Sequence, residues 1–584
     1  MSRRLLQISL IVVLTGIFYL PSLQNGFVWD DDQYLHANQA VQSDDGLTRI
    51  WFSHEMPQYY PLVFTSFWVE HQLWGIEPFG YHAVNLGLHI ANALLVFLLL
   101  EALCPSLALA VGLLFALHPV QVETVAWISE RKNLLGCLFY LLAIRCYLNF
   151  QAGAGRRQYL LSLGAFSLAL LSKSITATFV VVPLLLKWWK REPIKKADLV
   201  AIAPFAGLGL LCGLQTVYLE LYRVGASGDA WRLTLAEHLV LPGQIVWFYL
   251  AKLLFPVELV FIYPKWILDA GSPWQWLPTL ALVVLGVSLY RRRDSLGRGA
   301  FATYLGYLAA LFPALGFFNV YPMRFSYVAN HFQYIASIGA FIFFAGLVEG
   351  SCARLAMRLE WFAKPRVRTG LAAIILCGVS LVYGVKILDY SRVFASEATL
   401  WEDVVAKNPA SSMAHNNLGY LYKKQGDMQA AIGRFKTAIA TDPGNALAYN
   451  NLGLSYGLLG RREESRAAFE DALRIDPEFA SAYNNLGLLY LNAGDVARGF
   501  DYFSRASTLA PSMLEAHYNL AECHLLQGQP GAAVEALQRA LALQPRHSMI
   551  LRKLASAYAL TGQVERAAAL RQQADQLDPP GRLP

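Results

Sequence analysis

The sequence predicts an all-α protein in which a polytopic bundle of membrane helices precedes a solenoid of helical repeats. Of its 584 residues, 55% are hydrophobic and only 15% are charged, whereas a soluble chain carries about 25% charged residues. Mean hydropathy is +0.37, and apolar segments recur as far as Leu388. From Pro409 onward, Pro and Gly instead recur at a fixed interval, which is typical of stacked repeats.

The first part of the chain contains a series of apolar segments. They are 5–22, 84–103, 107–117, 134–150, 158–172, 174–189, 198–219, 239–263, 274–290, 302–318, 334–349 and 370–388. Those shorter than the ~20 residues that a span needs must extend into their flanks. Pro242, Gly243 and Pro256 interrupt 239–263, so we expect a re-entrant pair or an interfacial helix there. About eleven crossings remain, and the first is expected to be uncleaved because no small-x-small site lies near Ser22.

Clusters of Lys and Arg define the expected orientation of the spans. They are Arg3–Arg4, Arg156–Arg157, Lys187–Lys196, Arg291–Arg293 and Arg354–Arg368. The positive-inside rule places them in the cytoplasm, so the N-terminus is cytoplasmic and everything after Leu388 is extracytoplasmic. The net charge of +7 therefore reflects topology, and we expect no nucleic-acid partner. Short loops and compact spans favour a multi-pass protein of a bacterial inner membrane with periplasmic repeats.

The C-terminal part has a 34-residue period. Pro recurs at 409, 443, 477, 511, 545 and 579, and Gly recurs at 426, 460, 494, 528 and 562. A 34-residue period with Leu-Gly in the first helix and Pro after the second is the tetratricopeptide signature. We therefore expect five repeats, with a degenerate lead-in near Trp401, stacked into one right-handed solenoid. The predicted domains are 1–390 and 395–584.

Four polar stretches fall on the same outer face of this topology. They are Phe27–Tyr34, His118–Lys132, Ser172–Ser174 and Tyr321–Tyr334. Ionisable groups at the edge of a bilayer are costly, so their convergence favours a functional site. For the first stretch, the alternative is a solvated turn in which Asp30 caps a helix. The loop 23–83 predicts short helices at the interface, with most of its Trp and Tyr residues in an aromatic belt.

Together these stretches resemble the GT-C membrane glycosyltransferases. The motifs are Phe27-Val28-Trp29-Asp30-Asp31, His118-Pro119-x-x-x-Glu123 with Trp127-Ile128-Ser129-x-Arg131-Lys132, Ser172-Lys173, and Tyr327 to Gly339. Their order before tetratricopeptide repeats is similar to that of the TMTC-like proteins and the related protein O-mannosyltransferases. The resemblance implies an inverting enzyme that moves a sugar from a polyprenyl phosphate to an acceptor at the outer membrane face.

Such a reaction needs a base for the acceptor hydroxyl and cations for the leaving phosphate. Asp30 matches the family's acid and is the expected base, with Asp31 second, whereas Asp32 is expected to cap or solvate the following helix. The resemblance suggests donor-phosphate contacts, since cations stabilise charge that grows on a leaving group. The candidates are Arg131, Lys132 and Lys173, for which snorkelling at the interface is the alternative.

Glu123 lies in the second acidic motif. It can orient the acceptor, pair with Arg131, or bind a divalent cation (Mg²⁺ or Mn²⁺) with Asp30. We favour the first two roles because two carboxylates from distant loops are few ligands for a hard cation. The seven Cys are scattered without metal-site spacing. His118, beside Pro119, is expected to make a structural hydrogen bond at a helix end, with a role in the site as the alternative.

The chain departs twice from the pattern of the family. It has Ala329-Asn330-His331-Phe332 where the family often has Ala-Asp-Arg-Tyr, and Lys173-Ser174 where the family often has Lys-Glu. The first change removes an Asp and an Arg that can contact phosphate or acceptor. Arg324 is the candidate that compensates for the missing cation.

Four asparagines occupy one position of successive repeats. They are Asn417, Asn451, Asn485 and Asn519. Their spacing resembles the asparagine ladder of the nucleocytoplasmic O-GlcNAc transferase, in which it holds peptide backbones along the concave face. An Asn amide can pair with backbone N–H and C=O groups whatever the peptide sequence. The alternative is that these residues help the repeats to pack.

The leading hypothesis is a glycosyltransferase that uses a polyprenyl-phosphate sugar to modify Ser or Thr hydroxyls of a protein, which the solenoid recruits directly or through an accessory protein. One alternative is a non-catalytic membrane scaffold that uses its solenoid to assemble envelope complexes. A third hypothesis has a small glycan or a lipid as the acceptor. Asp30 and the outer cations favour the enzyme, whereas Asn330-His331 favours the scaffold.

Overall fold

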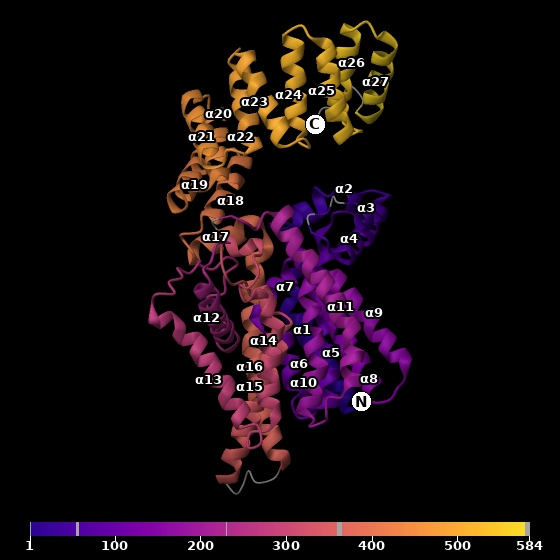
Figure 1. The fold of residues 1–584 in the computed structure, drawn as a ribbon, viewed down its shortest axis with the longest axis vertical. Coiled ribbons are helices and arrows are strands. Elements are labelled where there is room, and N and C mark those ends of the chain that lie inside the picture. The colour runs from indigo at the N-terminus through magenta and orange to yellow at the C-terminus, as the bar shows by residue number, and fades with distance from the viewer. Residues whose placement is uncertain (1, 54–55, 57, 229–230, 359–364, 579–584) are drawn as a thin grey trace. The chain divides into compact units, whose positions relative to one another are not determined.

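The computed structural model describes residues 2–53, 56, 58–228, 231–358 and 365–578. These residues form α-helices joined by short 3₁₀ and π turns, and no strand occurs among them, as the sequence predicted. The chain divides into two compact units, Met1–Pro409 and Ala410–Pro584, each described here by itself (Figure 1).

The first unit is a multi-pass membrane domain by the length and composition of its helices. Among the described residues, seven helical stretches are long and apolar enough to cross a membrane, and a bent pair, Ala108–Ala116 with Pro119–Ala126, makes up to eight. The seven are Arg3–Gln24, Pro78–Leu103, Ile128–Gln151, Lys196–Val224, Pro273–Arg291, Ala336–Arg354 and Gly370–Ala395. The sequence predicted about eleven spans. The difference arises because several of the expected spans form helices that are too short to meet this criterion. Ser174–Trp189 is one such shorter apolar helix.

Helix α5 (Pro78–Leu103) lies inside the bundle, packed against α1 (Arg3–Tyr19), α6 (Ala108–Ala116) and α8 (Arg131–Gln151). Its His89 bonds the Tyr334 hydroxyl at 2.8 Å and the Ala116 carbonyl at 3.0 Å. Asn92 donates to the Leu134 carbonyl at 3.0 Å. Polar groups cannot find water at membrane depth, so these bonds fix α5 to its neighbours.

The remaining helices of this unit complete the bundle. They are α9 (Arg156–Ser172), α10 (Val181–Trp189), α11 (Lys196–Leu219), α12 (Leu235–Leu254), α13 (Leu277–Arg291), α14 (Arg298–Leu311), α15 (Ala336–Arg358) and α16 (Pro365–Tyr390). In the segment that was expected to be re-entrant or interfacial, a single helix, α12, forms behind a Thr234–Glu237 capping box. A Cβ on Gly243 would lie 2.4 Å from the Thr279 backbone nitrogen, so glycine allows α12 and α13 to approach closely.

The loop after the first span packs into a hydrophobic core that it shares with residues of α5 and α8. It contains α2 (Gln39–Gln42), α3 (Gly46–Phe52) and α4 (Pro61–Trp74). Tyr34, Ile50, Phe64 and Phe67 are buried together, and Trp51, Trp68 and Trp74 pack against them. The expected short helices are present. Many of the loop's aromatic side chains pack against this core while staying partly exposed, and the expected interfacial belt stays a prediction.

The second unit consists of five antiparallel helix pairs, as the 34-residue period predicted. They are α18 (Ser412–Lys424) with α19 (Met428–Thr441), α20 (Ala446–Leu458) with α21 (Arg462–Ile475), α22 (Ala480–Asn492) with α23 (Val496–Leu509), α24 (Leu514–Leu526) with α25 (Pro530–Leu543), and α26 (Ser548–Leu560) with α27 (Val564–Leu577). The periodic glycines of 426 to 562 join the two helices of each pair with φ between 72° and 85°, a conformation that favours glycine.

A second glycine series lets the helices of a pair approach. A Cβ on Gly419, Gly453 or Gly487 would lie 2.7 Å from the ring of a Phe sixteen residues later, in the second helix of the pair. The next repeat has Ala521 at this position and Leu537 in place of the Phe, and both are buried. Where alanine replaces the smaller glycine in the first helix, leucine replaces the larger phenylalanine in the second, which keeps the pair close-packed.

Helix α17 (Glu397–Lys407) belongs to the first unit, although the sequence places it inside the predicted repeat domain 395–584. Its Trp401 is buried against Trp29, with ring centroids 4.8 Å apart. Lys407 donates to the Leu259 carbonyl at 2.8 Å. The lead-in to the repeats therefore packs on the membrane unit, against Trp29 and Leu259.

Candidate functional site

The first feature of the site is a tight turn at Val28–Asp31. Trp29 has a φ of 54°, a left-handed conformation that a bulky residue rarely adopts. The buried Asp31 holds this turn, because one carboxylate oxygen accepts from the Val28 backbone N–H at 3.0 Å. Its other oxygen accepts from the backbone N–H and the hydroxyl of Ser129, at 2.8 and 2.5 Å. Asp31 therefore ties the turn to the start of α8 and, in this structure, acts as a positioning residue.

Asp30 lies next to this strained residue with its side chain only half-buried. Its carboxylate accepts from the Trp127 indole N–H at 3.0 Å. Burial raises the pKa of Asp30 above its usual range, and the nearby Lys132 ammonium acts in the opposite direction. Burial, together with the Asp30 charge, raises the pKa of Asp31 to about 7. A carboxylate with a raised pKa is a stronger base than an ordinary Asp.

Beside Asp30 lies a chain of buried charges centred on Glu130. Its carboxylate pairs with the Lys132 ammonium at 2.9 Å and with the Lys173 ammonium at 3.3 Å. The Lys132 ammonium also lies 5.4 Å from the ring centroids of Tyr34 and Trp127. Burial lowers the pKa of Lys173 to about 8, although Glu130 favours its charged form. Lys132 and Lys173, which were both predicted to contact the donor phosphate, thus pair with the same carboxylate.

Glu123 completes the cluster from the other side. Its carboxylate accepts from the Asn330 side-chain amide at 2.9 Å and forms an ion pair with His331 Nδ1. The other imidazole nitrogen of His331 lies 3.8 Å from Glu130. His331 therefore lies between two buried carboxylates, so Asn330 and His331, the departure from the family pattern, both contact Glu123 at this place.

Arg131 does not join this cluster. It is fully buried and forms an ion pair with Glu70, with Nη2 at 3.1 Å from the second carboxylate oxygen. It also donates to the Asn85 side chain and to the Tyr81 carbonyl. The predicted pairing of Arg131 with Glu123 is therefore wrong, because Glu70 is its partner. Its contact with a donor phosphate stays a prediction, and these contacts hold its guanidinium within the protein.

The other candidates lie apart from the charge cluster. The buried His118 ring bonds the Leu253 carbonyl at 3.0 Å and the Val120 N–H at 3.2 Å, the structural role that its sequence context favours. Arg324 is exposed, and its guanidinium lies over the Phe325 ring. Asp32 is exposed at the start of a short π turn. Within the described ranges, no three His, Cys, Asp or Glu side chains are grouped as metal ligands.

The four ladder asparagines lie in the first helices of their repeats, and three of them bond across repeat boundaries. Asn451, Asn485 and Asn519 each donate at 2.9 Å to the asparagine 35 residues earlier, Asn416, Asn450 and Asn484. Asn417, at the start of the series, has a buried amide nitrogen without a partner among the described residues. One amide hydrogen of each later ladder residue is thus used in packing between repeats.

Sequence reasoning missed Glu130 and the role of Ser129. The sequence analysis assigned roles to Arg131 and Lys132 but none to Glu130, which directly precedes them. An acidic residue before two basic residues at a membrane edge is itself a signal of ion pairing. The position of His331 between Glu123 and Glu130 had no local signal, because its partners lie about two hundred residues away in the chain.

Comparisons with known proteins agree with both halves of this architecture. Tetratricopeptide-repeat models match residues 410–478, 478–546 and 527–582. The chain is 37% identical over 146 residues to the protein O-mannosyl-transferase Tmtc1 of Drosophila melanogaster, covering 23% of this chain and 17% of that protein. It is 24% identical over 489 residues to the protein O-mannosyl-transferase TMTC4 of Mus musculus, covering 72% of this chain and 64% of that protein.

Among solved structures, the tetratricopeptide protein YrrB is 21% identical with a TM-score of 0.27, covering 32% of this chain and 95% of that one. The match to Tmtc1 spans less than a fifth of that relative, and the match to TMTC4 just under two thirds. The resemblance read from the motifs is confirmed: the chain is a multi-pass membrane protein with C-terminal tetratricopeptide repeats, homologous to the TMTC-type protein O-mannosyl-transferases.

Proposed function

We propose that the protein is an inverting membrane glycosyltransferase that moves a sugar from a polyprenyl-phosphate donor to a Ser or Thr hydroxyl of a protein on the extracytoplasmic face. The observation that carries the proposal is the placement of Asp30 beside the Lys132–Glu130–Lys173 cluster, which brings a base and two cations to one place. The printed names of the relatives support the reaction class.

In the proposed reaction, Asp30 takes the proton of the acceptor hydroxyl as its oxygen bonds to the anomeric carbon of the sugar. The bond from that carbon to the phosphate oxygen breaks, and the electron pair leaves with polyprenyl phosphate. General-base catalysis of this kind is worth about 10²–10⁴ in rate. Trp127 holds the Asp30 carboxylate by its indole N–H, which orients one oxygen and leaves the half-buried side chain open to an acceptor.

Lys132 and Lys173 are proposed to stabilise the leaving phosphate. Their ammonium groups pair with Glu130 in the structure, so the donor phosphate has to compete with this carboxylate for both lysines. Glu123, fixed by Asn330 and His331, is proposed to orient the acceptor. Arg324 is exposed and can reach a donor only from outside the cluster.

We further propose a GT-C-like bundle of about eleven crossings. Counting α1, α5, α6, α8, α9, α10, α11, α13, α14, α15 and α16 as crossings and leaving α12 on the outer side brings every basic cluster to the cytoplasm. The proposed functional domains are 1–390 for transfer and 395–584 for protein binding. A bacterial inner membrane with periplasmic repeats is the proposed location. The solenoid is proposed to bind the acceptor or an accessory protein.

The experiment is to incubate the purified full-length protein with a panel of polyprenyl-phosphate sugars and a Ser/Thr-containing acceptor, and to measure donor turnover. Asp30→Asn keeps the shape of the side chain but removes the proton acceptor, so transfer should fall by about two orders of magnitude while donor binding persists. Asp32→Asn is the matched control, since Asp32 is exposed and lies outside the cluster.

Equal transfer by the Asp30→Asn variant and the parent would contradict the assignment of the base. Absence of turnover with every donor in the panel would favour the non-catalytic scaffold. Turnover with a glycan or lipid acceptor in place of a protein would retain the chemistry and change only the acceptor.

A further inference from the structure

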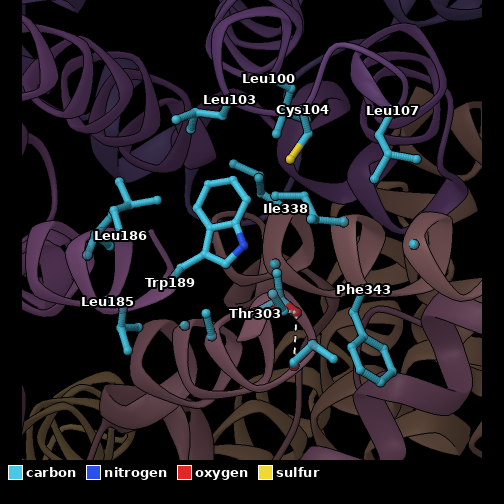
Figure 2. Close-up of a pocket in the computed structure, with 18 of the residues that line it drawn as sticks. Leu100, Leu103, Cys104, Leu107, Leu185, Leu186, Trp189, Thr303, Ile338 and Phe343 are labelled. Carbon is cyan, nitrogen blue, oxygen red and sulfur yellow. Dashed lines mark hydrogen bonds between the residues drawn. The ribbon is translucent and has the colours of Figure 1, made fainter. Parts of the chain in front are cut away.

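A deep apolar cavity of about 570 Å³ lies inside the membrane unit, away from the charge cluster. Leu100, Leu103 and Cys104 of α5 form one wall, and Trp189 of α10, Thr303 of α14 and Ile338 of α15 form others (Figure 2). A cavity of this size that is lined by aliphatic side chains is typical of a site for an apolar ligand or chain. The charge-cluster residues Asp30, Lys132 and Lys173 are not part of its lining.

The charged side chains of the cavity lie at one end. Arg298 and Arg354 line it together with Trp189, at the start of α14, the last turns of α15 and the end of α10. Ala336 lines the opposite end of α15, about 27 Å away at 1.5 Å per helical residue. This end of the bundle carries the basic clusters, so it faces the cytoplasmic leaflet.

Arg298 has a guanidinium hydrogen-bond donor available for an anion at this end of the cavity. Its guanidinium stacks over the Trp188 ring at 5.1 Å, and its Nη1 donates to the Trp188 carbonyl at 3.0 Å. Its Nε–H is buried and has no partner within the part of the chain that the structure describes. A buried donor without an acceptor is costly. Figure 2 shows the Trp189 indole projecting into the cavity among its aliphatic walls.

We propose that the cavity binds one anionic phospholipid of the cytoplasmic leaflet, with its phosphate at Arg298 and Arg354 and its acyl chains along α5, α14 and α15. Charge complementarity selects this occupant. Both arginines stand at the end opposite Lys132 and Lys173, so a sugar donor whose phosphate lies at the charge cluster would leave them without an anion. Arginine suits phosphate because its donors form a rigid fork, and Trp is enriched at the level of lipid head groups.

The test is native mass spectrometry of the purified full-length protein titrated with phosphatidylglycerol, phosphatidylcholine of the same chains, or undecaprenyl phosphate. We expect one phosphatidylglycerol to be retained, and Arg298→Gln to weaken its retention roughly tenfold through loss of a charged hydrogen bond. Arg292→Gln is the matched charge control, because Arg292 is exposed and lies outside the cavity.

A second variant tests the apolar part without altering charge. Gly346 lines the cavity, and a Cβ there would meet nothing within 4 Å, so Gly346→Leu should fill space and displace the lipid. Gly378→Leu on the exposed side of α16 is its matched control. Equal retention of phosphatidylglycerol and phosphatidylcholine, or retention unaffected by Arg298→Gln and Gly346→Leu, would overturn the proposal. Displacement of phosphatidylglycerol from the parent by undecaprenyl phosphate would also overturn the proposal and assign the cavity to the donor.

Discussion

Asp31 accepts two hydrogen bonds from Ser129, one from its backbone N–H at 2.8 Å and one from its hydroxyl at 2.5 Å. Ser129 precedes α8 by two residues, and Asp31 follows the residue proposed as the base, so this contact holds the loop after the first span close to Lys132 of α8. Trp29 keeps a positive φ in the same turn. Strained residues persist where surrounding contacts determine them, and they are frequent at active sites.

Ser129→Ala should weaken this connection without abolishing the fold. The backbone N–H still reaches Asp31, so loss of the hydroxyl bond is expected to cost about 1 kcal/mol, measured as a fall in melting temperature. Transfer should fall several-fold through kcat rather than KM, because the position of Asp30 changes. Ser167→Ala is the control, since its hydroxyl donates only within α9. Equal effects of the two variants on transfer would contradict the positioning role.

The rate of transfer should have a bell-shaped dependence on pH. Burial raises the pKa of Asp30, so the base gains its proton at a higher pH than an ordinary Asp, and the rate falls on the acid side. The pKa of Lys173 is lowered to about 8, so its charge, and the stabilisation of phosphate, are lost as pH rises through that value. Lys173→Arg keeps the charge at high pH. The alkaline limb, measured from kcat/KM, should move upward in this variant, and an unchanged limb would contradict the role of Lys173.

Glu130→Gln should reveal whether the two lysines hold phosphate. The change removes the carboxylate shared by Lys132 and Lys173, and breaking a buried ion pair costs about 3 kcal/mol. Undecaprenyl phosphate should restore part of this stability by supplying a new negative charge. Its effect on melting temperature is therefore expected to be larger in the variant than in the parent. A shift of the same size in both proteins would argue against phosphate at the lysines.

Asn485→Ala should lower the stability of the repeats. The change leaves the Asn450 side-chain oxygen, which accepts from Asn485 at 2.9 Å, without its donor. The expected cost is about 1–2 kcal/mol, measured by thermal unfolding followed by circular dichroism. Asn492→Ala, at the end of the same helix and outside the ladder, is the control. If peptide binding falls while the melt is unchanged, the ladder serves a ligand and not packing.

The orientation of the membrane unit can be checked by reporter fusions. A reporter fused after Pro584 should behave as periplasmic and one fused after Arg293 as cytoplasmic, because the basic clusters then lie inside. Cytoplasmic behaviour of the Pro584 fusion would place the charge cluster on the wrong side for an extracytoplasmic transfer.

Much of the architecture could be predicted because its signals are local. The 34-residue period predicted five helix pairs, because each repeat buries its apolar face only against its neighbours. Hydropathy identified the membrane unit, but several of its helices are shorter or more bent than a simple span. The position of Asp30 after the first span was visible in the sequence as a carboxylate at the membrane edge.

The sequence by itself determined the all-α class and the repeat register, and it marked Asp30, Lys132 and Lys173 as candidate site residues. Only the tertiary structure decided which of these residues pair. Arg131 and Lys132 are adjacent in the chain, yet Arg131 is buried against Glu70 whereas Lys132 joins Glu130 and Lys173. Adjacent side chains on a helix point in different directions, and a buried charge takes the partner that lies within reach after packing. The partner of each charge therefore depends on contacts between distant segments, which no local pattern records.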